Sequence, residues 1–123
     1  MKKILILVDS ITIANAMQRF LTAAGYEVET QYESKTFFDG RATAFDPDLL
    51  ILDINMPHFD GFNILEMATE LKTCPNAKIV MCSTKIFEQD IKRADALGVE
   101  NFLKKPFNAE KLLSKVADVI GTP

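Results

Sequence analysis

Short runs of Ile, Leu and Val alternate along the chain with longer segments that mix apolar and polar residues. Apolar runs of this kind, bounded by turn residues, are typical of strands that are buried on both faces of a sheet. Together with a more polar segment after Gly25, they predict strands at residues 4–8, 27–31, 49–52, 79–82 and 99–103. The last segment is short and more polar, which is typical of a strand at the edge of a sheet.

The longer segments carry apolar residues at intervals of three and four, as expected for helices with one buried face. They predict helices at residues 10–24, 34–45, 62–71 and 86–97, and a last helix from a cap at Asn108 to about residue 120. Ser34 is the expected N-cap of the second helix, and Gly40 weakens its interior. We expect the first helix to face inward with Ile13, Met17, Phe20 and Leu21, and the second with Phe37, Phe38 and Ala42.

Strands that alternate with helices predict a parallel sheet covered on both faces, in the α/β class. Because crossover connections are right-handed, few topologies remain. The usual one at this length is the flavodoxin-like doubly wound fold, with five parallel strands in the order 2-1-3-4-5 and five helices. We therefore expect one domain over residues 1–123.

The charge and composition exclude several classes of protein. The net charge of −3 gives no sign of a basic face, so direct binding of nucleic acid is not expected. No apolar stretch approaches the roughly 20 residues that span a bilayer, and the run at residues 4–8 is too short for a signal peptide. Cys74 and Cys82 form no CxxC motif and are expected to be thiols in a reducing compartment. These features predict a cytoplasmic protein without membrane contact.

Polar residues stand where four of the predicted strands end: Asp9, Asp53, Ser83 and Lys105. Ligands of doubly wound sheets bind at this edge. Asp9 and Asp53, with a loop carbonyl such as that of Asn55, offer oxygen ligands, and Mg²⁺ fits them best because it accepts few protein ligands and keeps several waters. Adding the Ser83 hydroxyl and the Lys105 ammonium gives a set that can stabilise a phosphoryl group during in-line transfer. Taken singly, Asp9 is more typical of a helix N-cap, and Asp53 is as typical of a turn as of a site.

Three segments of the chain resemble those of receiver domains of bacterial two-component response regulators. They are DLLILDINMPHFDGF at residues 48–62, KIVMCST at residues 78–84 and NFLKKPF at residues 101–107. The resemblance runs without gaps over essentially the whole chain. It implies that Asp53 is the phosphoacceptor, that Asn55 supplies a metal-binding carbonyl and that Lys105 binds the phosphoryl group. It further implies that Ser83 is the switch hydroxyl, that Phe102 is the switch aromatic and that the Lys105–Pro106 bond is cis.

By this resemblance the chain is a signalling switch of the size of the single-domain chemotaxis regulators. Asp53 would take a phosphoryl group from a sensor histidine kinase or a phosphotransfer protein, with Mg²⁺ as cofactor. The phosphorylated form would then bind a downstream effector protein or output domain. The chain is not expected to be an enzyme, beyond catalysing its own phosphorylation and dephosphorylation.

The chain departs from the family at the end of the first strand, where receivers carry two adjacent acids. Here Asp9 stands alone between Val8 and Ser10. In one register Val8 replaces the first acid and Asp9 is the direct metal ligand; in the other Ser10 replaces the second acid. We favour the first register, because it keeps the spacing to Gly25 free of gaps. Two milder departures are Thr84, which follows the switch hydroxyl, and His58, which is expected to be a solvated loop residue.

Two other functions are open on the sequence. Val8 supports a degenerate receiver, which would act as an interaction module without phosphorylation. A flavodoxin-like FMN protein needs a Gly-rich phosphate loop after the first strand, and residues 10–14 contain no glycine. An aspartate-nucleophile hydrolase needs a second Asp two residues after Asp9, where Ile11 stands.

Overall fold

The computed structural model describes residues 1–33, 35, 37–56 and 60–123 of the chain. All strands lie in one parallel sheet of order β2-β1-β3-β4-β5. The prediction of a flavodoxin-like sheet in the order 2-1-3-4-5 is confirmed. The strands are β1 (Lys3–Leu7), β2 (Glu27–Gln31), β3 (Leu49–Asp53), β4 (Lys78–Ser83) and β5 (Asn101–Lys104).

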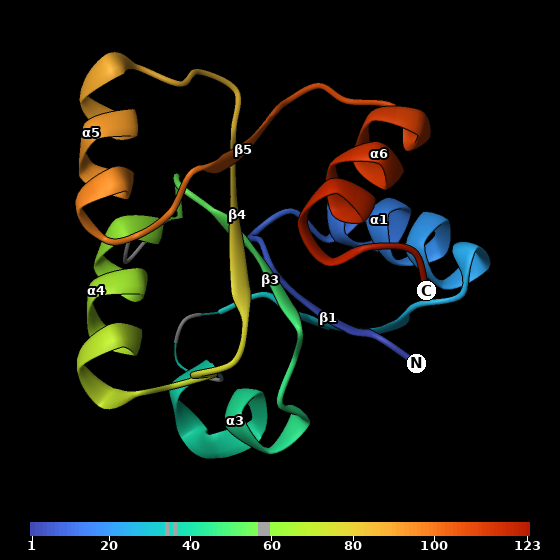
Figure 1. The fold of residues 1–123 in the computed structure, drawn as a ribbon, viewed down its shortest axis with the longest axis horizontal. Helices are drawn as coiled ribbons and strands as arrows, with labels where there is room; N and C mark the ends of the chain where they lie inside the picture. Colours follow the sequence, from blue (N-terminus) through green and yellow to red (C-terminus); the bar gives the residue numbers. More distant parts are fainter. Residues whose placement is uncertain (34, 36, 57–59) are drawn as a thin grey trace.

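Helices cover both faces of this sheet, with α1 and α6 on one side and α3, α4 and α5 on the other (Figure 1). Alternate residues of β1 feed two separate cores. Ile4 and Ile6 point to the α1–α6 side, and Leu5 and Leu7 to the other. The helical segments are α1 (Ile11–Ala24), the π-helical η1 (Phe37–Arg41), α3 (Ala42–Phe45), α4 (Gly61–Leu71), α5 (Glu88–Ala96) and α6 (Ala109–Ile120).

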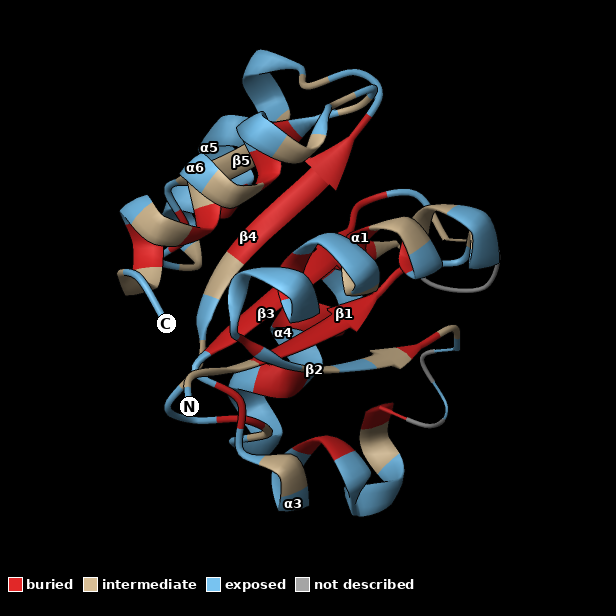
Figure 2. Cartoon of the chain, turned by 90° about the vertical axis from the view of Figure 1, so that its right-hand side faces the viewer, coloured by how far each residue is buried: buried red, intermediate tan, exposed pale blue. Residues whose placement is uncertain are grey.

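The central strands are buried along most of their length, as their apolar sequences predict (Figure 2). Every residue of β3 is buried, including Asp53 at its end. Burial of a carboxylate is costly unless it has partners. The fold therefore marks Asp53 as the exceptional residue of an otherwise apolar strand.

The predicted second helix is interrupted. Gly40, inside η1, has a φ of 103°, which is outside the helical range, and kinks the segment shortly before α3 begins at Ala42. The expected cap Ser34 lies outside the described residues, while Phe37 and Ala42 are buried and Phe38 is partly buried, as predicted. A glycine in a helix interior thus ends the regular structure here instead of only weakening it.

Smaller differences concern one helix face and two element boundaries. Phe20 is 37% exposed and does not join the buried face of α1, where Ala14 lies with Met17 and Leu21. The strand predicted at residues 99–103 begins only at Asn101, because the Val99 N–H donates to the Ala94 carbonyl at the end of α5. Likewise α5 is shorter than the predicted helix at residues 86–97.

The helices α5 and α6 are held to the molecule by different means. Leu112, Val116 and Val119 bury one face of α6, and Asn108 caps it through a hydrogen bond from the Lys111 N–H at 2.8 Å. All residues of α5 are described, and Ala94 is the one that is buried. The attachment of α5 through the core is therefore slight.

Candidate functional site

The carboxyl ends of the strands bring the predicted site residues to one edge of the sheet. Asp53 is the last residue of β3 and is paired with Cys82, next to Ser83 at the end of β4. Lys105 directly follows β5, and its N–H donates to the Ser83 carbonyl at 2.7 Å. Parallel pairing thus places residues from three distant parts of the sequence side by side.

Asp53 is buried, with 2% of its surface exposed, and both carboxylate oxygens have partners. Its Oδ2 accepts from the Lys105 ammonium at 2.9 Å, and its Oδ1 accepts from the Asn55 N–H at 3.1 Å. Burial raises the pKa of Asp53 above its ordinary value, and Lys105 opposes this rise. The paired ammonium is what makes a charged carboxylate tolerable at this position.

Lys105 is held at both ends: its ammonium donates to Asp53, and its backbone N–H donates to the Ser83 carbonyl. Its side chain is 12% exposed, and the Lys105–Pro106 bond is cis, as the family resemblance implies. Burial lowers the pKa of Lys105, but the hydrogen bond to Asp53 and the charges of Cys82, Asp53 and Asp9 together outweigh it, so the pKa is raised. The pair is a buried carboxylate with a cation already in place.

The Ser83 hydroxyl lies at the end of β4 and is fully engaged. It donates to the Lys85 carbonyl at 2.9 Å and accepts from the Lys85 N–H at 3.3 Å. It also accepts from the Asn55 side-chain amide at 3.1 Å. The sequence suggested only the carbonyl of Asn55 as a functional group, so this use of its amide is a feature that sequence reasoning missed.

The end of the first strand contributes one charged residue, Asp9, between Val8 and Ser10. Val8 is fully buried on the same side as Ile4 and Ile6, whereas Asp9 is exposed. Asp9 follows β1 two residues after Leu7, which pairs with Leu52 of β3, and the charge of Asp9 contributes, least of the causes, to the raised pKa of Asp53. Ser10 is occupied as the N-cap of α1, where its hydroxyl accepts from the Ile13 N–H at 3.3 Å.

The predicted donors for a metal at this edge are oxygens, those of the Asp9 and Asp53 carboxylates and of the Asn55 carbonyl. Among the described residues there is no group of three or more His, Cys, Asp or Glu side chains that could hold a metal ion. Two carboxylates and a carbonyl still fit Mg²⁺, which binds hard oxygen ligands and keeps several waters in its octahedral shell. The donor set fits the metal but carries one acid fewer than the resemblance implies.

The remaining candidates lie around this group. Phe102 is partly buried on β5 and packs against the core on the α4–α5 side, and Thr84 is exposed beside Ser83. His58 lies outside the described residues. The structure thus brings Asp53, Asn55, Ser83 and Lys105 into direct contact, with Asp9 nearby and Phe102 on the adjoining strand.

Gly61 is a further residue that bears on the site. Its N–H donates to the Ile54 carbonyl at 2.7 Å, and an added Cβ would lie 2.4 Å from the backbone oxygen of Asp53. Any side chain here would push the start of α4 away from the end of β3. The sequence signal for this role is the glycine itself, which begins an otherwise regular amphipathic helix.

The chain is similar to proteins of one family. The family model for the response regulator receiver domain matches residues 4–117. The chemotaxis protein CheY of Treponema pallidum is 34% identical over 96% of this chain and 82% of its own length. YvcP of Bacillus subtilis, an uncharacterised transcriptional regulatory protein, is 32% identical over 98% of this chain, which spans about half of its length.

The structural comparison agrees with the sequence comparison. The crystal structure of the chemotaxis protein CheY4 of Vibrio cholerae is 31% identical, with a TM-score of 0.86 over 97% of this chain and 98% of that one. No helix of the described residues is long and apolar enough to cross a bilayer.

Proposed function

The chain belongs to the family of response regulator receiver domains, and from this we propose that it is a switch that takes a phosphoryl group from a histidine kinase onto Asp53. The observation that carries the proposal is the buried Asp53 carboxylate bound to Lys105 at 2.9 Å. An ordinary core position would not hold this pair, because each charge is costly to bury. A site that stabilises an incoming phosphoryl group needs both.

In this proposal an oxygen of the Asp53 carboxylate attacks the phosphorus of a phosphohistidine. The new O–P bond forms as the P–N bond breaks, and the imidazole leaves with the bonding electron pair. Lys105 favours the charged, nucleophilic form of Asp53 beforehand and then stabilises the negative oxygens of the phosphoryl group. The Ser83 hydroxyl would exchange its hydrogen bond to the Lys85 carbonyl for one donated to a phosphoryl oxygen.

Asp9, Asp53 and the carbonyl of Asn55 would hold Mg²⁺. When bound, the ion supplies positive charge that offsets the negative oxygens of the phosphoryl group. The protein residues set the position of the acceptor. Asn55 positions two site residues: its N–H donates to Asp53, and its side-chain amide donates to Ser83.

We propose that the chain acts on no substrate but its own phosphoryl group. Its partners are then a histidine kinase or phosphotransfer protein on one side and an effector protein or output domain on the other. We expect this exchange to take place in the cytoplasm, without direct contact with nucleic acid or membrane.

The test is incubation with acetyl phosphate and Mg²⁺ followed by mass spectrometry of the intact protein. One phosphoryl adduct is expected on the wild type and none on Asp53→Asn, because Asn has the same shape but is not a nucleophile. Labelling of the variant at the same stoichiometry would overturn the assignment of Asp53.

A degenerate receiver is the second candidate, and the burial of Val8 in the place of an acid favours it. That function predicts no adduct on the wild type and no Mg²⁺ binding up to tens of millimolar in a calorimetric titration.

A further inference from the structure

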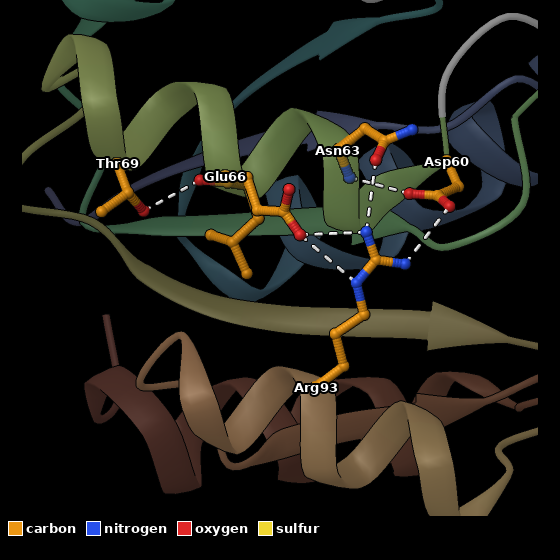
Figure 3. Close-up of polar contacts among 6 residues, drawn as sticks. Asp60, Asn63, Glu66, Thr69 and Arg93 are labelled. Carbon is orange, nitrogen blue, oxygen red and sulfur yellow. Dashed lines mark hydrogen bonds and ion pairs between the residues drawn. The ribbon is translucent and has the colours of Figure 1, made fainter.

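A cluster on the α4–α5 side connects two helices near the site. The Arg93 guanidinium, on α5, reaches three side chains at the start of α4 (Figure 3). Its Nη2 donates to Glu66 Oε1 at 2.9 Å and to Asn63 Oδ1 at 3.2 Å, and its Nε donates to Glu66 Oε1 at 3.3 Å. Its Nη1 lies 3.6 Å from Asp60 Oδ2. We call Arg93, Asp60, Asn63 and Glu66 the Arg93 clamp.

The clamp is more than one exposed ion pair. Isolated surface pairs contribute little, but several contacts to one planar guanidinium fix its position. The guanidinium carbon also lies 4.8 Å from the ring centroid of Phe62, which is buried. Since Ala94 is the one buried residue of α5, these contacts form much of what attaches α5 to the molecule.

The α4 end of the clamp is fixed to the phosphoacceptor strand. Asp60 caps α4 through its other oxygen, which accepts from the Asn63 N–H at 2.7 Å. The next residue, Gly61, contacts the backbone of Asp53 closely, and its N–H donates to the Ile54 carbonyl. The first turn of α4 is therefore held to the end of β3 by contacts that do not involve α5.

The α5 end is joined to the switch hydroxyl. Ser83 is tied to the backbone of Lys85, three residues before the start of α5. If Ser83 turned toward a phosphoryl group on Asp53, the segment leading into α5 would move with it. Hydrogen bonds near 3 Å do not survive a shift of about an ångström. The clamp thus belongs to the state in which Ser83 is bound to Lys85.

We propose that the Arg93 clamp is a built-in latch that holds α5 in the unphosphorylated position and opposes phosphorylation of Asp53. This inference rests on the proposed function of Asp53. Because the two states are linked, a contact made only in the unphosphorylated state lowers the affinity for a phosphoryl group by up to the free energy of that contact. Arg93 acts through α5 and touches no reacting atom, so it is a positioning residue.

The test measures binding of beryllofluoride, which imitates a phosphoryl group, in the presence of Mg²⁺. We expect Arg93→Ala to bind it about threefold to fivefold more tightly than the wild type. Backbone amides of Glu88–Ala96 should also exchange hydrogen faster in the unliganded variant, while those of α6 should not change. A loss of structure alone would weaken binding instead of strengthening it.

Lys92→Ala is the matched control. It removes the same charge from the same helix, but Lys92 pairs with Glu88 inside α5 at 3.7 Å and does not reach α4. It should bind beryllofluoride like the wild type. Glu66→Ala should resemble Arg93→Ala, and the double variant should add little, because the two residues contact each other.

The outcomes separate the latch from the function it rests on. If the wild type binds no beryllofluoride and Asp53 is not labelled, the proposed function fails. If the wild type binds but Arg93→Ala binds equally or more weakly, the latch is wrong and the function stands. Equal gains in Arg93→Ala and Lys92→Ala would show an effect of net charge and would also overturn the latch.

Discussion

Asp53 and Lys105 meet at 2.9 Å in a largely buried part of the site, whereas Asp9 is exposed and its neighbour Val8 belongs to the apolar core. The Asp53–Lys105 pair already places the charges that bind a phosphoryl group. The end of the first strand offers the Asp9 carboxylate to a metal, but it holds one acid fewer than the family pattern implies. The difference teaches that the end of the first strand can lose an acid while the acceptor and its cation stay in place, because Asp53 and Lys105 are positioned by β3 and β5 and Asp9 follows β1.

The largest effect is expected on the Lys105 side. Lys105→Ala should slow labelling by acetyl phosphate on the order of 100-fold, since it removes a preorganised charge from the reacting oxygens. Mg²⁺ affinity should stay the same or rise slightly, because a nearby positive charge is gone. Rates of adduct formation by mass spectrometry and calorimetric Mg²⁺ titration measure the two effects. The exposed neighbour Lys104 gives the control Lys104→Ala, which should change neither. Loss of metal binding in Lys105→Ala would show that the two sides are not separate.

A smaller effect is expected on the Asp9 side. Val8→Asp should raise Mg²⁺ affinity about fivefold to tenfold, because it adds negative charge beside Asp9 and Asp53. The metal-free variant should lose about 1–3 kcal/mol of stability, since Val8 is fully buried and a polar group there lacks partners. Calorimetry and urea denaturation with and without Mg²⁺ check both changes.

Ser10→Asp tests the other register and serves as the control. Asp caps helices as well as Ser does, so α1 should keep its stability, and Mg²⁺ affinity should change little. A large gain in Mg²⁺ affinity with Ser10→Asp and none with Val8→Asp would show that Ser10, and not Val8, stands in the place of the missing acid. No gain with either would favour the degenerate receiver.

The smallest effect is expected from pH, because burial and Lys105 act on Asp53 in opposite directions. The pKa of folded Asp53 is raised by burial, so the folded state holds this proton more tightly than the unfolded state. Its contribution to stability is complete below the unfolded pKa of about 3.9 and is lost as the pH rises through the folded value. The free energy of unfolding of the wild type, relative to Asp53→Asn, should therefore increase as the pH is lowered from about 7 toward 4. Urea denaturation at each pH, without metal, gives this difference. A decrease would mean that the charge of Lys105 outweighs burial.

The sheet order was predictable because it follows from local patterns and the handedness of crossovers. The second helix was predicted as continuous because its apolar spacing is regular, but the backbone at Gly40 takes a positive φ that a sequence pattern does not report. Phe20 was placed inward by the same spacing. Its exposure depends on which residues α1 meets in three dimensions, and the buried residues of α1 are Ala14, Met17 and Leu21.

The site could be predicted as far as backbone positions determine it. Asp53, Ser83 and Lys105 are brought together because each ends or directly follows a strand. The bond from the Asn55 amide to Ser83 depends on the shape of a loop, which spacing does not give.

The Arg93 clamp shows the same limit. The three-residue spacing of Asp60, Asn63 and Glu66 predicts one face of a helix, but their partner lies on a different helix. Only the packing of α5 beside α4 reveals it.

The anchoring of α6 has a practical consequence for anyone who builds a biosensor from this chain. The carbonyls of residues 119–121 accept hydrogen bonds from Lys2, Lys78 and Tyr26, which stand at the amino ends of strands, whereas Asp53 stands at a carboxyl end. If the Arg93 clamp opens as proposed, a fluorophore on Pro123 should report little change, because the neighbouring residues 119–121 are held by these hydrogen bonds. A fluorophore at Ile91, exposed on α5, would sit on the part held by the Arg93 clamp and would change its emission when the clamp opens.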